Sequence, residues 1–238
     1  MESKSIAKIT YKQYLNPKTC HFCIASVPIF SSLTKKQLEK VSLVIRLKTY
    51  AKGEIIYRTG EVSDAFHILQ EGHIRIYRLA ESGKEQLIRI VNPSEFTGEL
   101  ALFKKGNYEA YAEAITDVTV CQISHLDFQS LLAEYPSISL IMLTEISKRL
   151  GTSEQQSTWF TTETVRSRLA HFLISQINST ATQPIVDLPM CKKDLASYLG
   201  TTPESISREF SKFEKQQSIL ELSHTCFKIL NVDALLSF

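Results

Sequence analysis

The sequence predicts an α+β protein in which an antiparallel β-barrel or jelly roll precedes a long helix and a C-terminal winged helix-turn-helix. Three observations predict this architecture. Six of the eight glycines lie between Gly53 and Gly106, where they separate short runs rich in Ile, Tyr, Phe and Leu. Residues 136–160 carry a helical pattern. In residues 190–219, apolar residues recur at helical spacing on both sides of Gly200, which predicts two short helices joined by a tight turn.

Composition limits the class of protein. The chain has 238 residues, of which 43% are hydrophobic and 22% charged, enough for one or two ordinary cores. It contains no apolar run of about eighteen residues and no signal-peptide core at its start, so we expect a cytoplasmic protein without a membrane span. Residues 161–238 contain eight Lys plus Arg and eight Asp plus Glu, so net charge alone does not predict DNA binding.

The chain divides into four predicted parts. Residues 1–30 are a polar tail with a Cys-x-x-Cys motif, and residues 31–135 form the barrel domain. Residues 136–160 form the long helix, and residues 161–238 form the helix-turn-helix domain. Within these parts we expect a short helix that runs to Leu47. Barrel strands are expected at His73–Tyr77, Gln86–Val91 and Val118–Ile123, a helix at Thr161–Ile177, and wing strands within Leu220–Leu230.

The second helix of the predicted helix-turn-helix has two different sides. Gly200 tolerates the left-handed backbone of the turn, Thr202 can cap the helix, and Pro203 suits its first position. Apolar residues at i, i+4 and i+7 form the inner side, and the outer side offers a carboxylate, hydroxyls and a guanidinium, the groups that read base edges in a major groove. The alternative is the solvated face of an ordinary helical hairpin. The candidate DNA-contacting residues are Glu204, Ser207, Arg208, Ser211, Lys212, Lys192, Lys193 and Thr202.

At these residues the chain resembles the CRP/FNR family of bacterial transcription regulators. Glu204, Ser207 and Arg208 match the E-x-x-S-R pattern in the recognition helix of the FNR branch. Lys52-Gly53-Glu54, Gly72-His73-Ile74 and Gly98-Glu99-Leu100 resemble landmarks of the family's cyclic-nucleotide-binding-type jelly roll. The resemblance implies a homodimeric activator that binds an FNR-like TTGA palindrome and acts on RNA polymerase.

The barrel departs from relatives that bind a cyclic nucleotide. In those proteins Gly-Glu-Leu is followed, about ten residues on, by Arg and then Ser or Thr, whereas this chain has Glu109 and Ala110. A carboxylate repels the phosphate that an arginine would bind, so we do not expect cyclic AMP to be the effector. Control by another small molecule or by a metal in the barrel stays open.

The long helix carries a heptad-like seam. The family places a dimerisation helix here, and a two-fold reader of DNA requires one. The first half of the seam is apolar and the second half polar, which predicts a marginal interface suited to a switch. The seam consists of Leu143, Ile146, Leu150, Ser153, Ser157 and Phe160.

The cysteines indicate redox or metal chemistry. Five cysteines, an odd number, argue against a disulfide framework. Cys20, Cys23 and Cys121 match three of the four cysteines that hold an iron-sulfur cluster in FNR-type regulators, and the third N-terminal cysteine is missing. The chain also resembles Flp-type proteins, which use fewer such cysteines as a thiol/disulfide switch.

Three uses of these thiols therefore stay open. They are a disulfide between Cys121 and Cys20 or Cys23, an iron-sulfur cluster with one non-cysteine ligand, and zinc with His21 as a further ligand. We expect Cys191 and Cys226 to be inert. A thiol oxidoreductase is the enzyme alternative, although its Cys-x-x-Cys normally begins a helix in a βαβ unit.

Overall fold

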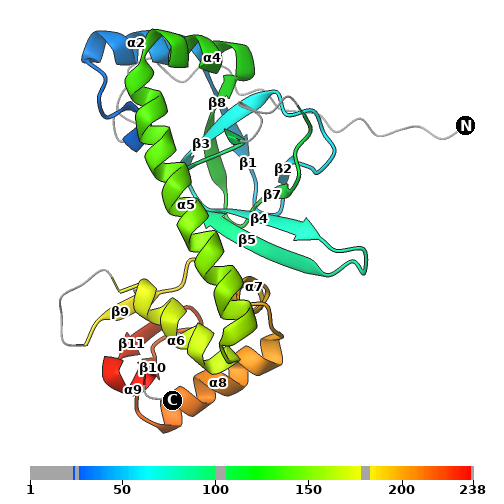
Figure 1. The fold of residues 1–238 in the computed structure, drawn as a ribbon, viewed down its shortest axis with the longest axis vertical. Coiled ribbons are helices and arrows are strands. Elements are labelled where there is room, and N and C mark those ends of the chain that lie inside the picture. Colours follow the sequence, from blue (N-terminus) through cyan, green and yellow to red (C-terminus); the bar gives the residue numbers. More distant parts are fainter. Residues whose placement is uncertain (1–23, 25–26, 100–105, 178–182, 237–238) are drawn as a thin grey trace, which may run out of the picture.

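The computed structural model describes residue 24 and residues 27–99, 106–177 and 183–236. A β-barrel lies at one end, helix α5 (Pro136–Thr162) leads away from it, and a smaller unit of helices and strands lies at the far end of α5 (Figure 1). The predicted α+β architecture is thus confirmed. Among the described residues, no helix is both long and apolar enough to cross a membrane.

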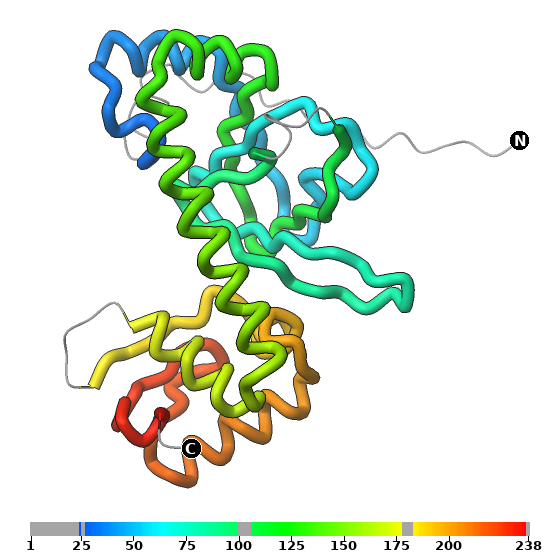
Figure 2. The backbone as a smooth tube through the Cα atoms, viewed as in Figure 1, coloured from blue at the N-terminus to red at the C-terminus, as the bar shows by residue number. Residues whose placement is uncertain are grey.

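The barrel consists of two four-stranded sheets whose strand pairs are all antiparallel. Their strand orders are β1-β8-β3-β6 and β2-β7-β4-β5, so β5 is an edge strand. The backbone trace shows the β4–β5 hairpin extending away from the rest of the barrel (Figure 2). The strands are β1 (Ile45–Tyr50), β2 (Ile55–Tyr57), β3 (Ala65–Glu71), β4 (Ile74–Leu79), β5 (Glu85–Val91), β6 (Phe96–Thr97), β7 (Tyr111–Ala114) and β8 (Val118–Ser124).

The helix expected to run to Leu47 is shorter than predicted. Short helix η1 (Pro28–Phe30) leads into α2 (Lys35–Val44), which begins at a capping box formed by Thr34 and Gln37. The chain then becomes strand β1, in which Leu47 lies opposite Cys121 of β8. Pairing with β8 therefore overrides the local apolar periodicity.

Two helices follow the barrel. Helix α4 (His125–Glu134) and α5 are separated at Tyr135, as the position of Pro136 predicts, because proline lacks the N–H needed inside a helix. Pro136 instead takes the first position of α5, where that N–H is not required. The first turns of α5 pack on the barrel through buried Ile138 and Met142.

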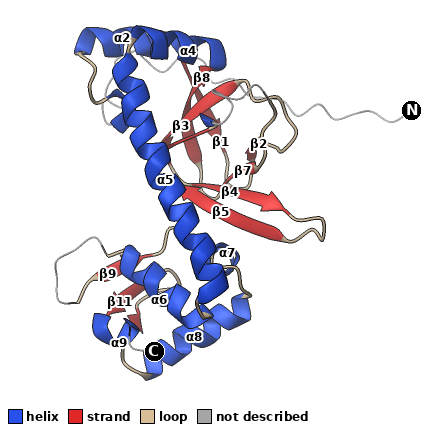
Figure 3. Cartoon of the chain, in the orientation of Figure 1, coloured by secondary structure: helices blue, strands red, loops and turns tan. Residues whose placement is uncertain are grey.

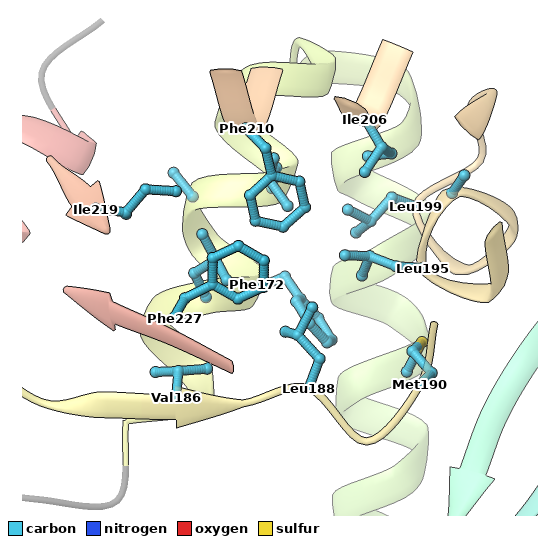
Figure 4. Packing of buried hydrophobic residues seen from close by; sticks show 14 of the residues in the cluster. Phe172, Val186, Leu188, Met190, Leu195, Leu199, Ile206, Phe210, Ile219 and Phe227 are labelled. Carbon is cyan, nitrogen blue, oxygen red and sulfur yellow. The ribbon is translucent and has the colours of Figure 1, made fainter. Parts of the chain in front are cut away.

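The C-terminal unit combines helices with a small sheet of order β10-β11-β9 (Figure 3). Its hydrophobic core gathers side chains from all of these elements (Figure 4). The elements are α6 (Val165–Ser175), β9 (Ile185–Asp187), α7 (Lys192–Tyr198), α8 (Pro203–Lys215), β10 (Ile219–Glu221), β11 (Cys226–Ile229) and α9 (Val232–Leu236).

Candidate nucleic-acid interface

Helices α7 and α8 are joined by the tight turn that the sequence predicts. Gly200 has a φ of 66°, in the left-handed region that favours glycine. A Cβ atom there would lie 3.2 Å from Cε1 of Phe160, a contact tight enough that the ring would have to shift by a few tenths of an ångström. The Thr202 hydroxyl caps α8 by accepting a hydrogen bond from the backbone N–H of Ser205 at 3.3 Å, and Pro203 begins the helix. The predicted capping is confirmed.

The inner side of α8 holds the helix against the domain. Ile206, Phe210 and Phe213 are at most 1% exposed. Ile206 and Phe210 point into the core (Figure 4), where the Phe210 ring stacks on that of Phe227 with centroids 4.5 Å apart. Burial of each of these three apolar side chains stabilises the folded domain by roughly 1.5 to 3 kcal/mol. Because this side of α8 faces the core, the opposite side faces solvent.

That opposite side is exposed and polar. Glu204, Ser207, Arg208 and Ser211 all lie at the surface. The hydrogen bond from its own backbone N–H, the Thr202 side chain and the nearby Arg208 charge lower the pKa of Glu204, so its carboxylate is an acceptor at neutral pH. Arg208 Nη2 donates to Ser205 Oγ at 3.1 Å, which orients the guanidinium along the helix. These side chains form a surface of hydrogen-bonding groups that base edges can meet.

The lysines proposed to contact phosphate differ in their surroundings. Lys193 and Lys212 are exposed, although Lys212 Nζ also lies 2.7 Å from Glu209 Oε1. Lys192 is half-buried and ion-paired, and its contact with phosphate stays a prediction. Its ammonium is 2.9 Å from Glu221 Oε2 and lies over the Phe210 ring, so its charge ties α7 to the small sheet. Sequence position alone could not distinguish a half-buried, ion-paired lysine from an exposed one.

Sequence reasoning missed Arg168 of α6. This side chain is 8% exposed, and its Nη1 donates to the carbonyl oxygen of Leu199 at 2.6 Å, at the C-terminal end of α7. Burial lowers its pKa, while a cation at this end of a helix meets carbonyl groups that have no partner within the helix. Its guanidinium also lies 5.5 Å from the centre of the Phe160 ring. Arg168 therefore joins the end of α5 to the turn of the helix-turn-helix.

The seam residues of α5 form an accessible row on this chain. Leu143 and Leu150 are 61% and 58% exposed, which is unusual for leucines on a helix that buries its other side. Ser153 and Ser157 continue the exposed row, and Ile146 is half-buried. Phe160 has an additional role, because it packs against Gly200 of its own chain.

The barrel carries a carboxylate where a phosphate-binding arginine is expected. Glu109 Oε2 lies 3.0 Å from Nη2 of Arg78, and both side chains are about half exposed. Glu99 is bonded to Arg149 of α5 at 3.1 Å and to Arg89 of β5 at 3.4 Å. Glu99 thus connects the barrel to the long helix.

Cys121 lies buried in β8 with 3% exposure. It borders a cavity of about 80 Å³, which is also lined by Ile24, Val27, Ile68, Leu69, Gln70 and Ser94. Cys20, His21 and Cys23 lie outside the described residues. In the part of the chain that the structure describes, no three His, Cys, Asp or Glu side chains are grouped as metal ligands. Cys191 is exposed and Cys226 is half-buried.

Comparison with known proteins identifies both halves of this arrangement. The model of the cyclic nucleotide-binding domain matches residues 47–135, and that of the Crp-like helix-turn-helix domain matches residues 167–238. The chain is 33% identical over 218 residues to the probable transcriptional regulator flp of Lacticaseibacillus casei, covering 92% of this chain and 98% of that one.

Two further similarities agree. The nitrogen fixation regulation protein FixK of Bradyrhizobium diazoefficiens is 28% identical over 208 residues, which covers 84% of this chain and 86% of FixK. The structure of FixK2 from Bradyrhizobium japonicum shares the fold, with a TM-score of 0.71 and 22% identity over 81% of this chain and 96% of that one. These relatives are regulators and not enzymes, which removes the thiol oxidoreductase alternative. The chain belongs to the CRP/FNR family of transcription regulators, in its FNR-like, Flp-type branch.

Proposed function

We propose that the protein is a homodimer that reads an FNR-like palindrome through α8 and regulates transcription by contacting RNA polymerase in the cytoplasm. The observation that carries this proposal is the exposed side of α8, where Glu204, Ser207 and Arg208 face outward from a helix fixed by three buried apolar side chains. The exposed row on α5, with Leu143 and Leu150, supports pairing of two copies. Two recognition helices would then meet half-sites about one helical turn apart.

A fluorescence anisotropy titration tests this function. The probe is a labelled duplex with two inverted TTGA half-sites centred about 10 to 10.5 base pairs apart. The control duplex has the same composition with both half-sites scrambled. We expect the protein to bind the palindrome at least about a thousand-fold more tightly than the scrambled duplex, as specific regulators do. Equal affinity for the two duplexes, in reduced and in oxidised samples alike, would contradict the proposal.

We further propose that a thiol/disulfide exchange involving Cys121 controls DNA binding. Cys121 borders a cavity that Ile24 also lines, and Cys23 directly precedes Ile24 in the sequence. Oxidation would join two thiols and release two electrons and two protons to an external oxidant, and a reductant would reverse the reaction.

The redox proposal is tested on protein purified without air. Counting of free thiols before and after oxidation, together with analysis of zinc, iron and sulfide, separates the disulfide from the two metal alternatives. We expect two thiols to be lost per chain on oxidation, with a change in affinity for the palindrome that is absent from Cys121→Ser and from the double variant Cys20→Ser/Cys23→Ser. Identical binding curves for reduced and oxidised parent protein would exclude redox control. The matched control is Cys191→Ser, since that thiol is exposed and distant in sequence from the barrel cysteines.

The carboxylate at Glu109 supports setting cyclic AMP aside as effector. It pairs with Arg78 and presents negative charge at the position where relatives bind a phosphate. A titration of the protein with cyclic AMP should therefore leave its affinity for the palindrome unchanged.

A further inference from the structure

The free edge of the barrel sheet is covered by a side chain from the DNA-reading unit. Among the residues that the structure describes, strand β5 has no neighbouring strand on its outer side. There Ser197 of α7 uses its hydroxyl twice: Oγ accepts from the backbone N–H of Leu87 at 2.7 Å and donates to the carbonyl oxygen of Glu85 at 2.8 Å. Nε2 of Gln86 donates to the carbonyl oxygen of Ser197 at 2.7 Å. A serine thus takes the place of a strand partner.

Charged and apolar contacts strengthen the same junction. Nη1 of Arg75 on β4 lies 3.3 Å from Oδ1 of Asp194 on α7, and both side chains are 14% exposed. Tyr77, Leu87 and Ile90 of the hairpin belong to the same hydrophobic cluster as the core of the C-terminal unit. The two parts of the protein are therefore joined by a packed interface as well as by the α5 backbone (Figure 1).

We infer that the junction of α7 with β5 is the device that sets the angle of the recognition helix, and that Ser197, Gln86 and Asp194 are positioning residues for it. Because α7 and α8 share one core, any rotation of α7 against the barrel carries α8 with it. Contacts of Phe160 and Arg168 attach the α7–α8 turn to the end of α5, and the junction with β5 adds a second restraint on that rotation. Three hydrogen bonds between fixed elements and one poorly exposed ion pair restrict it.

In a dimer this angle has a measurable consequence. Rigidly held reading helices fit one separation of half-sites, because each added base pair moves a half-site by about 3.4 Å and turns it by about 35° around the DNA axis. Loosely held helices would adjust to several separations. The junction therefore determines how strictly the protein selects the spacing of its palindrome, an inference that rests on the proposed function.

The test compares a set of palindromes that differ only in spacer length, from two base pairs shorter to two longer than the optimum. The double variant Gln86→Ala/Ser197→Ala removes all three hydrogen bonds, and Asp194→Asn removes the ion pair. The matched control is Ser175→Ala, whose hydroxyl donates to the carbonyl oxygen of Phe172 and accepts from Nε2 of Gln176, both at the C-terminal end of α6. Affinity for a duplex with a single half-site, and the circular dichroism spectrum, report whether each variant is folded and still recognises DNA.

We expect the parent protein and Ser175→Ala to prefer one spacing, and the double variant to lose about ten-fold of that preference while its affinity for a single half-site stays unchanged. Asp194→Asn should change the preference in the same direction. Unchanged spacer preference in a folded double variant would overturn the inference, as would tighter binding at the optimal spacing with the preference retained. If the parent protein binds no palindrome at any spacing, the proposed function fails and this inference fails with it.

Discussion

At the scale of single residues, Arg208 is the side chain on which the proposed recognition of a DNA sequence depends most directly. Its guanidinium is exposed on α8 and held along the helix by Ser205 Oγ. We predict that Arg208→Ala weakens binding to the palindrome by about 1 to 3 kcal/mol and relaxes discrimination at one base position. Anisotropy titrations with each base substituted in turn measure both effects. The comparison variant Lys193→Ala should weaken all duplexes alike, and equal losses on specific and scrambled DNA for Arg208→Ala would contradict its assignment.

His67 shows what burial does to one titratable group. The side chain is 3% exposed in β3, and desolvation together with the Lys48 charge lowers its pKa from 6.5 to about 4. Between these values the unfolded chain binds a proton at this position and the folded chain does not. The free energy of unfolding should therefore fall by up to about 3 kcal/mol as pH falls from 6.5 to about 4.

Urea unfolding at a series of pH values measures this contribution. The variant His67→Gln should lose that part of the pH dependence. His224→Gln is the control, because the His224 side chain is fully exposed in the folded protein. The same slope in His67→Gln as in the parent protein would show that other groups carry the pH dependence.

Among the secondary structure elements, the turn between α7 and α8 has the strictest requirement. Gly200 has a left-handed backbone, and a methyl group there would press on the Phe160 ring at 3.2 Å. We predict that Gly200→Ala costs about 1 to 2 kcal/mol for its backbone conformation alone, with the contact to Phe160 adding to this. Unfolding of the variant Gly200→Ala/Phe160→Leu separates the two causes, since the smaller side chain relieves only the contact. Unfolding free energies that match the parent protein's in both variants would refute the requirement.

The elements that sequence reasoning located are those defined by local rules. Gly200, Thr202 and Pro203 specify a turn and a helix start through their own backbone preferences, and the structure has both. The inner and outer sides of α8 follow from spacing alone. The end of α2 did not follow, because pairing of Ile45 with Ile123 of β8 decides it.

Contacts between distant segments could not be predicted from the sequence either, because tertiary packing decides them. Lys192, Arg168 and Ser197 have ordinary sequence surroundings, and their partners lie 29 to 112 positions away. The exposed position of the polar residues on α8 could be predicted, because these residues repeat with the helix period. The hydrogen bonds and ion pairs that hold this helix in place do not recur at a regular spacing in the sequence, so only the folded structure reveals them.

For the whole molecule, the seam on α5 sets the strength of the proposed dimer. Exposed Ser153 and Ser157 interrupt a row that begins with exposed leucines. We predict that Ser153→Leu/Ser157→Leu strengthens the dimer and makes binding to the palindrome independent of redox state, because added apolar burial contributes roughly 1.5 to 3 kcal/mol per side chain.

Sedimentation velocity over a range of concentrations measures the dimer, and anisotropy in reductant and oxidant measures its dependence on signal. Thr152→Leu/Thr158→Leu is the control, since these exposed threonines lie off the predicted seam. Redox dependence that survives in the leucine variant, or an equal effect of the control, would argue against the seam as the switching surface.

By covering the edge of β5, Ser197 also hinders pairing of this strand with a strand of another copy of the protein. An uncovered strand with unpaired N–H and C=O groups readily pairs with another chain, and β5 is such a strand once α7 is removed. A fragment that ends before α6 would present this strand to solvent. Proteolytic loss of the C-terminal unit would therefore leave a remnant that is prone to aggregation through this strand, and not a free sensor domain.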